Sequence, residues 1–171
     1  MASSPGADSA AADALALRRR TLTLALLTFT YFFSYMDRQI LAILQEMIKK
    51  DLQLSDTQLG LLSGLAFAIF YATLGIPVAR LADRSNRKNI VAVSLAIWSA
   101  MTAAGGLAQN FVQLLIARIG VGIGEAGSSP PSHSIIADLY PPEQRAGAMG
   151  IYSLGVVLGA ALGTFIGGLV A

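Results

Sequence analysis

The sequence predicts an all-α membrane protein with five transmembrane helices and a cytoplasmic N-terminus. Of the 171 residues, 54% are hydrophobic and only 13% are charged, and the mean hydropathy is +0.61. A soluble domain carries about 25% charged residues, so this composition is typical of a protein embedded in lipid. The apolar residues also gather in five long runs separated by short polar stretches. Runs of this length indicate helices that cross the roughly 30 Å hydrocarbon core of a bilayer.

The five predicted helices cover residues 22–48, 57–79, 89–108, 111–137 and 146–171. Residues 1–20 are predicted to form a disordered cytoplasmic lead-in, because they are mostly small and polar. The first apolar run, 22–36, rises only about 22 Å as a helix. The first helix therefore spans the bilayer only by taking Asp37 and Arg38 into it. In the alternative, both side chains reach the outer surface from a shorter helix.

Lysine and arginine residues in the short loops predict the orientation, because positively charged loops stay in the cytoplasm. Eight of the twelve lie on the side of the N-terminus: Arg18, Arg19, Arg20, Arg80, Arg84, Arg87, Lys88 and Arg145. Only Lys49 and Lys50 lie on the other side. We therefore expect a multi-pass membrane protein with its N-terminus inside. A secretory or twin-arginine signal is a weaker interpretation of the N-terminal arginines, since no small-x-small cleavage site follows them.

The second helix has a predicted start and a predicted packing face. Ser55 is a candidate N-cap, because Gln58 follows three residues later and completes the pattern of a capping box. Gly60 and Gly64 are four residues apart, so they lie on one face where another helix can approach.

Two further helices contain several glycines, which have no side chain and so reduce the width of the helix. In the fifth helix they recur every four residues, at Gly155, Gly159, Gly163 and Gly167. In the fourth helix they lie at Gly120, Gly122, Gly124 and Gly127. Both sets predict close contact with the backbone of a neighbouring helix. Pro130 and Pro131 are expected to disturb the hydrogen bonding of the fourth helix near its far end.

Four ionisable residues fall inside the predicted spans. They are Asp37 and Arg38 in the first helix, and Arg118 and Glu125 in the fourth. Each such residue costs about 2.5–3.5 kcal/mol to insert, and most of them pair or line a cavity. The helical rise puts Asp37 and Arg118 at a similar depth, with Glu125 about 10 Å nearer the cytoplasm. We therefore expect Asp37 to lie near Arg118, with Glu125 below them in the same cavity.

This charge set suggests proton coupling. Burial disfavours an ionised carboxylate and a nearby guanidinium favours it, so movement of an arginine can load or release a proton. Asp37 is the preferred coupling acid because of its expected arginine partner, and Glu125 is a second proton site or a substrate contact. Arg38 and Arg118 are expected to bind an anionic head group, a role that suits the guanidinium. Alternatively, the four residues form a static network that only fixes helix packing.

The segment 79–88 resembles the signature loop of the major facilitator superfamily, Gly-x-x-x-Asp-Arg/Lys-x-Gly-Arg-Arg/Lys. The matching residues are Asp83, Arg84, Arg87 and Lys88. Ala79 and Asn86 replace the two glycines. The resemblance implies that the matching residues form a cytoplasmic gating loop, which latches the two halves of a transporter in one conformation.

Two other resemblances point to the same superfamily. Residues 159–168 are similar to its fifth-helix motif, Gly-x-x-x-Gly-Pro-x-x-Gly-Gly, with Thr164 in place of Pro. That motif is associated with antiporters, so the substitution leaves the direction of transport open. A finer resemblance, to the spinster-like branch with its lysolipid and sphingolipid transporters, rests on residues 35–39, 59–64, 66–67, 117–127 and 138–145.

The resemblance implies the N-terminal part of a six-helix bundle, in a secondary transporter that works by alternating access. Its partners are then membrane lipid, a proton, a small amphipathic or anionic solute, and a C-terminal half that this chain lacks. Five helices supply less than one bundle, so the chain is expected to be a fragment that does not transport alone. The alternative is a short membrane assembly module.

Other classes of function are not expected. The chain has no Cys and only one His, His133, which excludes thiolate and His-rich metal sites. No Ser/His constellation suggests an enzyme, and no cofactor is expected. No acidic or basic tail indicates nucleic-acid binding.

Overall fold

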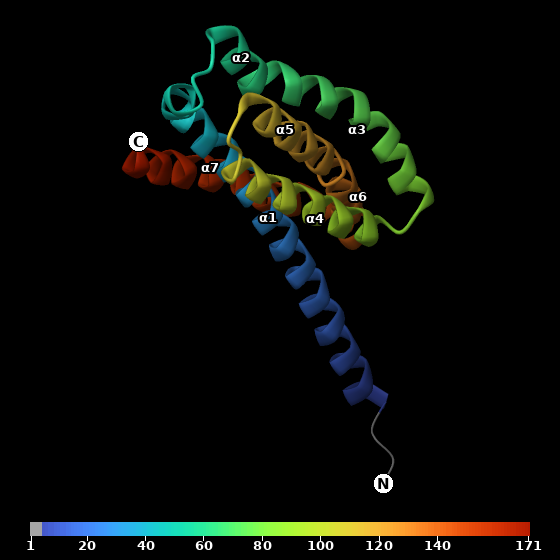
Figure 1. The fold of residues 1–171 in the computed structure, drawn as a ribbon. Helices are drawn as coiled ribbons and strands as arrows, with labels where there is room; N and C mark the ends of the chain where they lie inside the picture. The colour runs from blue at the N-terminus through green and yellow to red at the C-terminus, as the bar shows by residue number, and fades with distance from the viewer. Residues whose placement is uncertain (1–4) are drawn as a thin grey trace.

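A computed structural model describes the chain from Pro5 to Ala171, with side chains from residue 11 onward except those of residues 63, 65–67, 75, 79, 82 and 83. This part of the chain contains helices and no strand, as the sequence predicts. Figure 1 shows the helices gathered into one bundle, from which the N-terminal part of α1 (Pro5–Asp51) projects.

Three helical segments of the described residues are long and apolar enough to cross a membrane. They are α4 (Arg87–Gly106), α5 with α6 (Phe111–Leu139), and α7 (Pro142–Val170). The first predicted span lies in α1, where Asp37 and Arg38 interrupt the apolar run. The second predicted span contains a shorter apolar helix, Ala68–Val78. The chain is therefore an all-α, multi-pass membrane protein.

The first helix is longer than the sequence predicts. α1 begins at Pro5, so residues 5–20 are helical where a disordered lead-in was expected. Alanine has the highest helix propensity of all residues, and this segment contains many, which explains the extension. The extension is held at its end nearest the bundle, where the Arg20 guanidinium lies 4.5 Å from the centre of the Tyr140 ring.

The second predicted helix is divided into α2 (Asp56–Gly60), a π-helical segment η1 (Leu61–Leu65) and α3 (Ala66–Arg84). Ser55 caps α2 as predicted: its hydroxyl accepts from the Gln58 N–H at 3.2 Å, and the Gln58 side chain accepts from the Ser55 N–H at 2.9 Å. At the predicted packing face, a methyl group added at Gly60 or Gly64 would meet no atom of the described structure within 4 Å.

The fourth predicted helix is broken rather than disturbed. α5 (Phe111–Ala126) ends at Gly127, and α6 (Ser129–Leu139) begins with Pro130 and Pro131 in its first turn. Proline is tolerated there because the first N–H groups of a helix have no partner within the helix. The break separates α5, which contains Arg118 and Glu125, from α6.

Glycines allow close contacts between α7 and α1 and between α5 and α4. α7 packs against α1, and Figure 1 shows the two helices side by side. A methyl group at Gly155 or Gly163 would lie 2.7 Å from the carbonyl oxygen of Thr28 or Met36, respectively. α5 packs against α4, where a methyl group at Gly124 would lie 2.7 Å from the backbone nitrogen of Trp98. The glycines therefore set how deeply α1 and α5 lie within the bundle.

Two groups of buried apolar side chains hold the ends of the bundle. One group contains Leu24, Leu27, Val91, Ile135, Ile136, Ala148 and Tyr152. The other contains Leu54, Leu62 and Leu114. The predicted ionisable residues lie between these two groups along α1 and α5.

Candidate functional site

A buried ion pair between α1 and α5 forms the centre of the candidate site. The Glu125 side chain is only 1% exposed, and its Oε2 accepts from the Arg38 Nε at 2.8 Å. The Arg38 Nη2 contacts the same oxygen. The other carboxylate oxygen of Glu125, Oε1, is buried and has no hydrogen-bond donor among the described residues. One half of the carboxylate is therefore held by a cation, and the other half is available for a proton or a donor.

The helix packing explains why these two side chains meet. Gly124 lies against Trp98 of α4, so the next residue, Glu125, points about 100° away around α5, out of the α4 contact. Ser34 and Arg38 are four residues apart and share one face of α1. Ser34 is 5% exposed and lies beside the Glu125 carboxylate. This face of α1 thus places a hydroxyl and a guanidinium beside Glu125, and the guanidinium forms the ion pair.

Aromatic rings surround the guanidinium of Arg38. Its central carbon lies 5.2 Å from the centre of the Tyr35 ring and 5.6 Å from that of Tyr71 on α3, both within the range of a cation–π contact. Farther along α1, Tyr31 stacks on Tyr152 of α7 with ring centres 4.4 Å apart. The site therefore joins α1, α3 and α5 around one cation. Tyr31, Tyr35 and Tyr152 extend it towards α7, and we call these three rings the aromatic wall.

Asp37 and Arg118 lie in the same region without forming an ion pair. Asp37 Oδ2 accepts from the Thr102 hydroxyl of α4 at 3.3 Å. Arg118 is 9% exposed, and it pairs with no carboxylate in the part of the chain that the structure describes. The carboxylates whose charges act on it are Asp37, more strongly, and Glu125. Arg118 is thus a buried cation in the field of two acids.

The ion pair joins Arg38 to Glu125, whereas the depth count placed Asp37 near Arg118 and Glu125 below them. Depth alone does not give direction, because neighbouring residues on α1 point about 100° apart. Side chains also tilt towards the N-terminus of their own helix. α1 and α5 are antiparallel, so the side chains of Arg38 and Glu125 lean towards each other. This tilt brings their charged groups together although the two residues lie at different depths.

Comparison with known proteins identifies the family that carries this arrangement. The model of the Major Facilitator Superfamily matches residues 27–171. The chain belongs to the major facilitator superfamily. One relative, an MFS-type efflux pump of Mycolicibacterium smegmatis, is 39% identical over 164 residues, which cover 96% of this chain and 38% of the pump. Another, a hexuronate transporter of Bacillus subtilis, is 37% identical over 138 residues, which cover 81% of this chain and 32% of that protein.

A solved structure assigns the branch within the major facilitator superfamily. The crystal structure of a bacterial homologue of the human lysosomal transporter Spinster, in an inward-facing and unoccupied conformation, matches with a TM-score of 0.82 and 48% identity. The match covers 89% of this chain and 32% of the other. The chain therefore belongs to the spinster-like branch, and it spans about a third of the length of these relatives.

The signature loop of the superfamily is mostly helical in this chain. α3 continues to Arg84, five residues beyond its predicted end, and Asn86 caps α4 by accepting from the Lys88 N–H at 3.1 Å. The side chain of Asp83 lies outside the described residues. Arg84 and Lys88 are exposed. Arg87 instead forms an ion pair with Asp138 at the end of α6, a partner that the sequence did not predict.

Tyr140 and His133 lie near the signature loop, at the end of the bundle predicted to face the cytoplasm. Arg145 Nε donates to the Tyr140 carbonyl at 3.0 Å, so Tyr140 is held by arginines from both α1 and α7. The exposed His133, which received no role from the sequence, contacts the edge of the Tyr152 ring with centres 5.1 Å apart. Its Nδ1 lies 2.9 Å from the Ser129 carbonyl oxygen.

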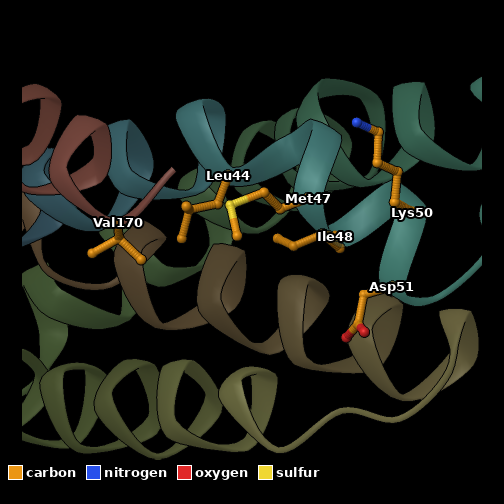
Figure 2. A pocket seen from close by; sticks show the side chains of 6 residues that line it. All are labelled: Leu44, Met47, Ile48, Lys50, Asp51 and Val170. Atoms are coloured by element: carbon orange, nitrogen blue, oxygen red, sulfur yellow. The ribbon is translucent and has the colours of Figure 1, made fainter.

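A cavity of about 710 Å³ lies at the C-terminal ends of α1 and α7, away from the ion pair. Figure 2 shows its lining, in which Leu44, Met47, Ile48 and Val170 supply apolar surface and Lys50 and Asp51 supply charge. It contains none of the residues of the charged site.

Proposed function

We propose that this chain forms the N-terminal part of a proton-coupled secondary transporter in a bacterial inner membrane. Its solute would be a small organic anion or an amphipathic molecule with an anionic head group, such as a lysolipid or a sphingolipid-like compound. The observation that carries the proposal is the buried Arg38–Glu125 ion pair, whose carboxylate keeps one oxygen without a described donor. Intramembrane charges are costly and usually mark a substrate or proton pathway. Membership of the major facilitator superfamily supports the same class of function.

The proposed coupling depends on competition for Arg38. While the guanidinium contacts Oε2, the ionised form of Glu125 is stabilised. An anion that binds Arg38 draws this cation away, and Glu125 then accepts a proton because an unpaired charge in a buried site is costly. Oε1 is the acceptor atom available for that proton. When the solute leaves, Arg38 returns to the carboxylate and the proton is released.

Glu125 replaces Asp37 as the preferred coupling acid. The sequence favoured Asp37 because of an expected arginine partner. In the structure, however, the acid that forms an ion pair with an arginine is Glu125, and its partner is Arg38. Asp37 accepts a hydrogen bond from Thr102 and acts on Arg118 through its charge. We propose that Asp37 is a second proton site, loaded when Arg118 engages the solute.

Arg118 and the aromatic wall would select the solute. Arg118 is a buried cation without an ion pair among the described residues, so an anionic head group would neutralise its charge. Guanidinium groups bind carboxylates and phosphates through two parallel hydrogen bonds. Tyr31, Tyr35 and Tyr152 offer ring faces and edges for the apolar part of the solute. The hexuronate transporter among the relatives, whose name denotes an anionic solute, supports this choice.

Alternating access requires a second bundle that moves against the first around a central site. We propose that five segments cross the membrane here: α1, the α2–η1–α3 unit, α4, the broken α5–α6 pair, and α7. The second bundle would come from a C-terminal half, like the remaining two thirds of the relatives. The gating residues Asp83, Arg84 and Lys88 would contact it on the cytoplasmic side.

The test uses the protein purified from its native membrane, in liposomes that enclose a pH-sensitive dye. Glucuronate and a lysophospholipid serve as probes of the two solute classes. We expect one of them to drive proton movement. Glu125→Gln should abolish that movement and retain exchange of labelled probe, whereas Glu143→Gln, at the exposed start of α7, should behave as wild type. Undiminished proton movement in Glu125→Gln would refute the assigned coupling acid, and movement with neither probe would refute the solute classes.

A further inference from the structure

Thr102 on α4 donates its hydroxyl hydrogen across a helix interface, to Asp37 on α1. The distance from Thr102 Oγ1 to Asp37 Oδ2 is 3.3 Å. Five other threonines donate instead to the carbonyl four residues earlier in their own helix: Thr21, Thr23, Thr28, Thr30 and Thr73. That local bond is common for a threonine within a helix, because the carbonyl is always within reach. The contact with a carboxylate is therefore a specific feature of Thr102.

The glycines of α5 explain where the Thr102 side chain points. Trp98 lies against Gly124 and Met101 lies against Gly120, so these residues mark the face of α4 that packs on α5. Thr102 follows Met101 and is turned about 100° from it, which places Thr102 at the edge of that face. Its hydroxyl can therefore reach α1. Both helices lie in the described bundle, so the contact needs no residue of a second bundle.

The charged groups around Asp37 come from α1 and α5. The charge of Asp37 acts on Arg118 and on Glu125, both of α5. Arg38 follows Asp37 in α1 and forms the ion pair with Glu125. Asp37 thus lies among two cations and a second acid, and its own hydrogen bond is with a neutral group.

The other helices at this level add no further charge. Residues 89–106 of α4 and 153–170 of α7 include no ionisable residue. On α3, the Tyr71 ring lies against the Arg38 guanidinium. The hydroxyl of Thr102 is therefore what α4 provides to the carboxylate.

A hydroxyl can bind a carboxyl group in both of its charge states. It donates to the ionised form and accepts from the O–H of the protonated form. A guanidinium has donors only, so Arg118 favours the ionised form alone. When Thr102 accepts from Asp37, its own hydrogen can turn to the Trp98 carbonyl, four residues earlier, as in the other five threonines. The contact can therefore persist while a proton arrives and leaves.

We propose that Thr102 is a positioning residue that holds the Asp37 carboxyl group while its proton is taken up and released. The inference rests on the proposed function, in which Asp37 is a second proton site. In the ionised state Thr102 donates to Oδ2, and in the protonated state the hydrogen on Oδ2 is donated to Thr102 Oγ1. Hydrogen bonds to charged groups are the stronger ones, so Thr102 also favours the ionised state.

The test follows protonation of Asp37 directly, by infrared difference spectroscopy of the protein purified from its native membrane during a pH titration. The carboxylic acid band that is lost in Asp37→Asn belongs to Asp37. Thr102→Val keeps the shape of the side chain and removes the hydroxyl, so it should shift the midpoint of this band by about one pH unit towards higher pH. Thr102→Ser keeps the hydroxyl and should titrate like wild type. The matched control is Thr28→Val, because the Thr28 hydroxyl donates to the Leu24 carbonyl at 2.8 Å within α1. It should leave the midpoint unchanged.

The infrared titration needs no solute, so its result is separate from the liposome test of the proposed function. Absence of a band that depends on Asp37, over the pH range in which the protein stays folded, would overturn the inference. An unchanged midpoint in Thr102→Val, or an equal shift in Thr102→Ser or Thr28→Val, would also overturn it. The expected shift together with no proton movement in the liposomes would refute the proposed transport and retain Thr102 as the residue that positions Asp37.

Discussion

Arg38 and Glu125 are 87 residues apart in the sequence, and they form a buried ion pair that connects α1 to α5. The pair depends on two backbone features: the glycines that hold α5 against α4, and the break at Gly127, which ends α5 soon after Glu125. Arg38 also contacts the rings of Tyr35 and Tyr71, so one guanidinium joins three helices. The pair is therefore important for stability as well as for the proposed transport.

Arg38→Ala should destabilise the protein more than the double variant Arg38→Ala/Glu125→Gln. Removing the cation alone leaves a carboxylate that is 1% exposed without a partner, which costs about 3–5 kcal/mol. The amide of Gln carries no charge, so the double variant should recover much of that loss. Thermal unfolding in detergent, followed by circular dichroism, measures the difference. Equal stability of the two variants would mean that Arg38 acts mainly through packing against the tyrosines.

Gly155→Ala and Gly150→Ala should have opposite effects, although both lie on α7. The added methyl group at Gly155 would lie 2.7 Å from the Thr28 carbonyl, and a backbone atom cannot move away cheaply. Overpacking of this kind costs about 1–3 kcal/mol. The methyl group at Gly150 meets no atom within 4 Å, so the higher helix propensity of alanine should stabilise α7 by about 0.5–1 kcal/mol. Unfolding midpoints that shift in the same direction would contradict this assignment of the α1–α7 contact.

Local signals in the sequence predicted the helices and several of their details. The Ser55 capping box is found as predicted, because both of its partners lie within four residues of each other. The glycines of α7 also lie on one buried stripe, since helical periodicity alone fixes which residues share a face. The π-helical segment over Leu61–Leu65 was not predicted, because an inserted residue in a helix leaves no clear pattern in composition.

The partners of the charged residues could not be derived from the sequence. The residues themselves were recognisable, because a charge within an apolar run is rare. Their pairing depends on how α1 and α5 are rotated about their axes, and tertiary packing sets that rotation. Thr102 and Ser34 were missed for the same reason, since neutral hydroxyl groups in a membrane helix are common and carry no signal of their own.

Arg87→Asp should be rescued by Asp138→Arg if the two residues are partners within this bundle. Arg87→Asp alone places two acids together, at the start of α4 and the end of α6, and should weaken the contact between these helices. The double variant, with both charges exchanged, restores an ion pair. The side chains are 31% and 68% exposed, so the coupling should be small, about 0–1 kcal/mol. A double-mutant cycle of unfolding free energies measures it. Absence of coupling would favour a partner for Arg87 in the second bundle.

Arg118→Gln should reduce solute binding without destabilising the protein, in contrast to Arg38→Ala. Arg118 is buried and forms no ion pair with the described residues, so replacing it removes a charge that the fold does not neutralise directly. Hydrogen bonds from a charged group to an anionic head group are worth about 1.5–3 kcal/mol, so the variant should bind such a solute roughly 10- to 150-fold more weakly.

Arg118→Lys separates charge from geometry at this position. It keeps the positive charge but loses the planar fork of the guanidinium, so its affinity for an anionic probe should lie between those of Arg118→Gln and wild type. Calorimetric titration of the purified protein with glucuronate or a lysophospholipid measures the affinities, and thermal unfolding of the same samples measures stability. A lower unfolding midpoint with unchanged affinity in Arg118→Gln would assign Arg118 to a static network. A loss of affinity at unchanged stability would make it a solute-binding residue.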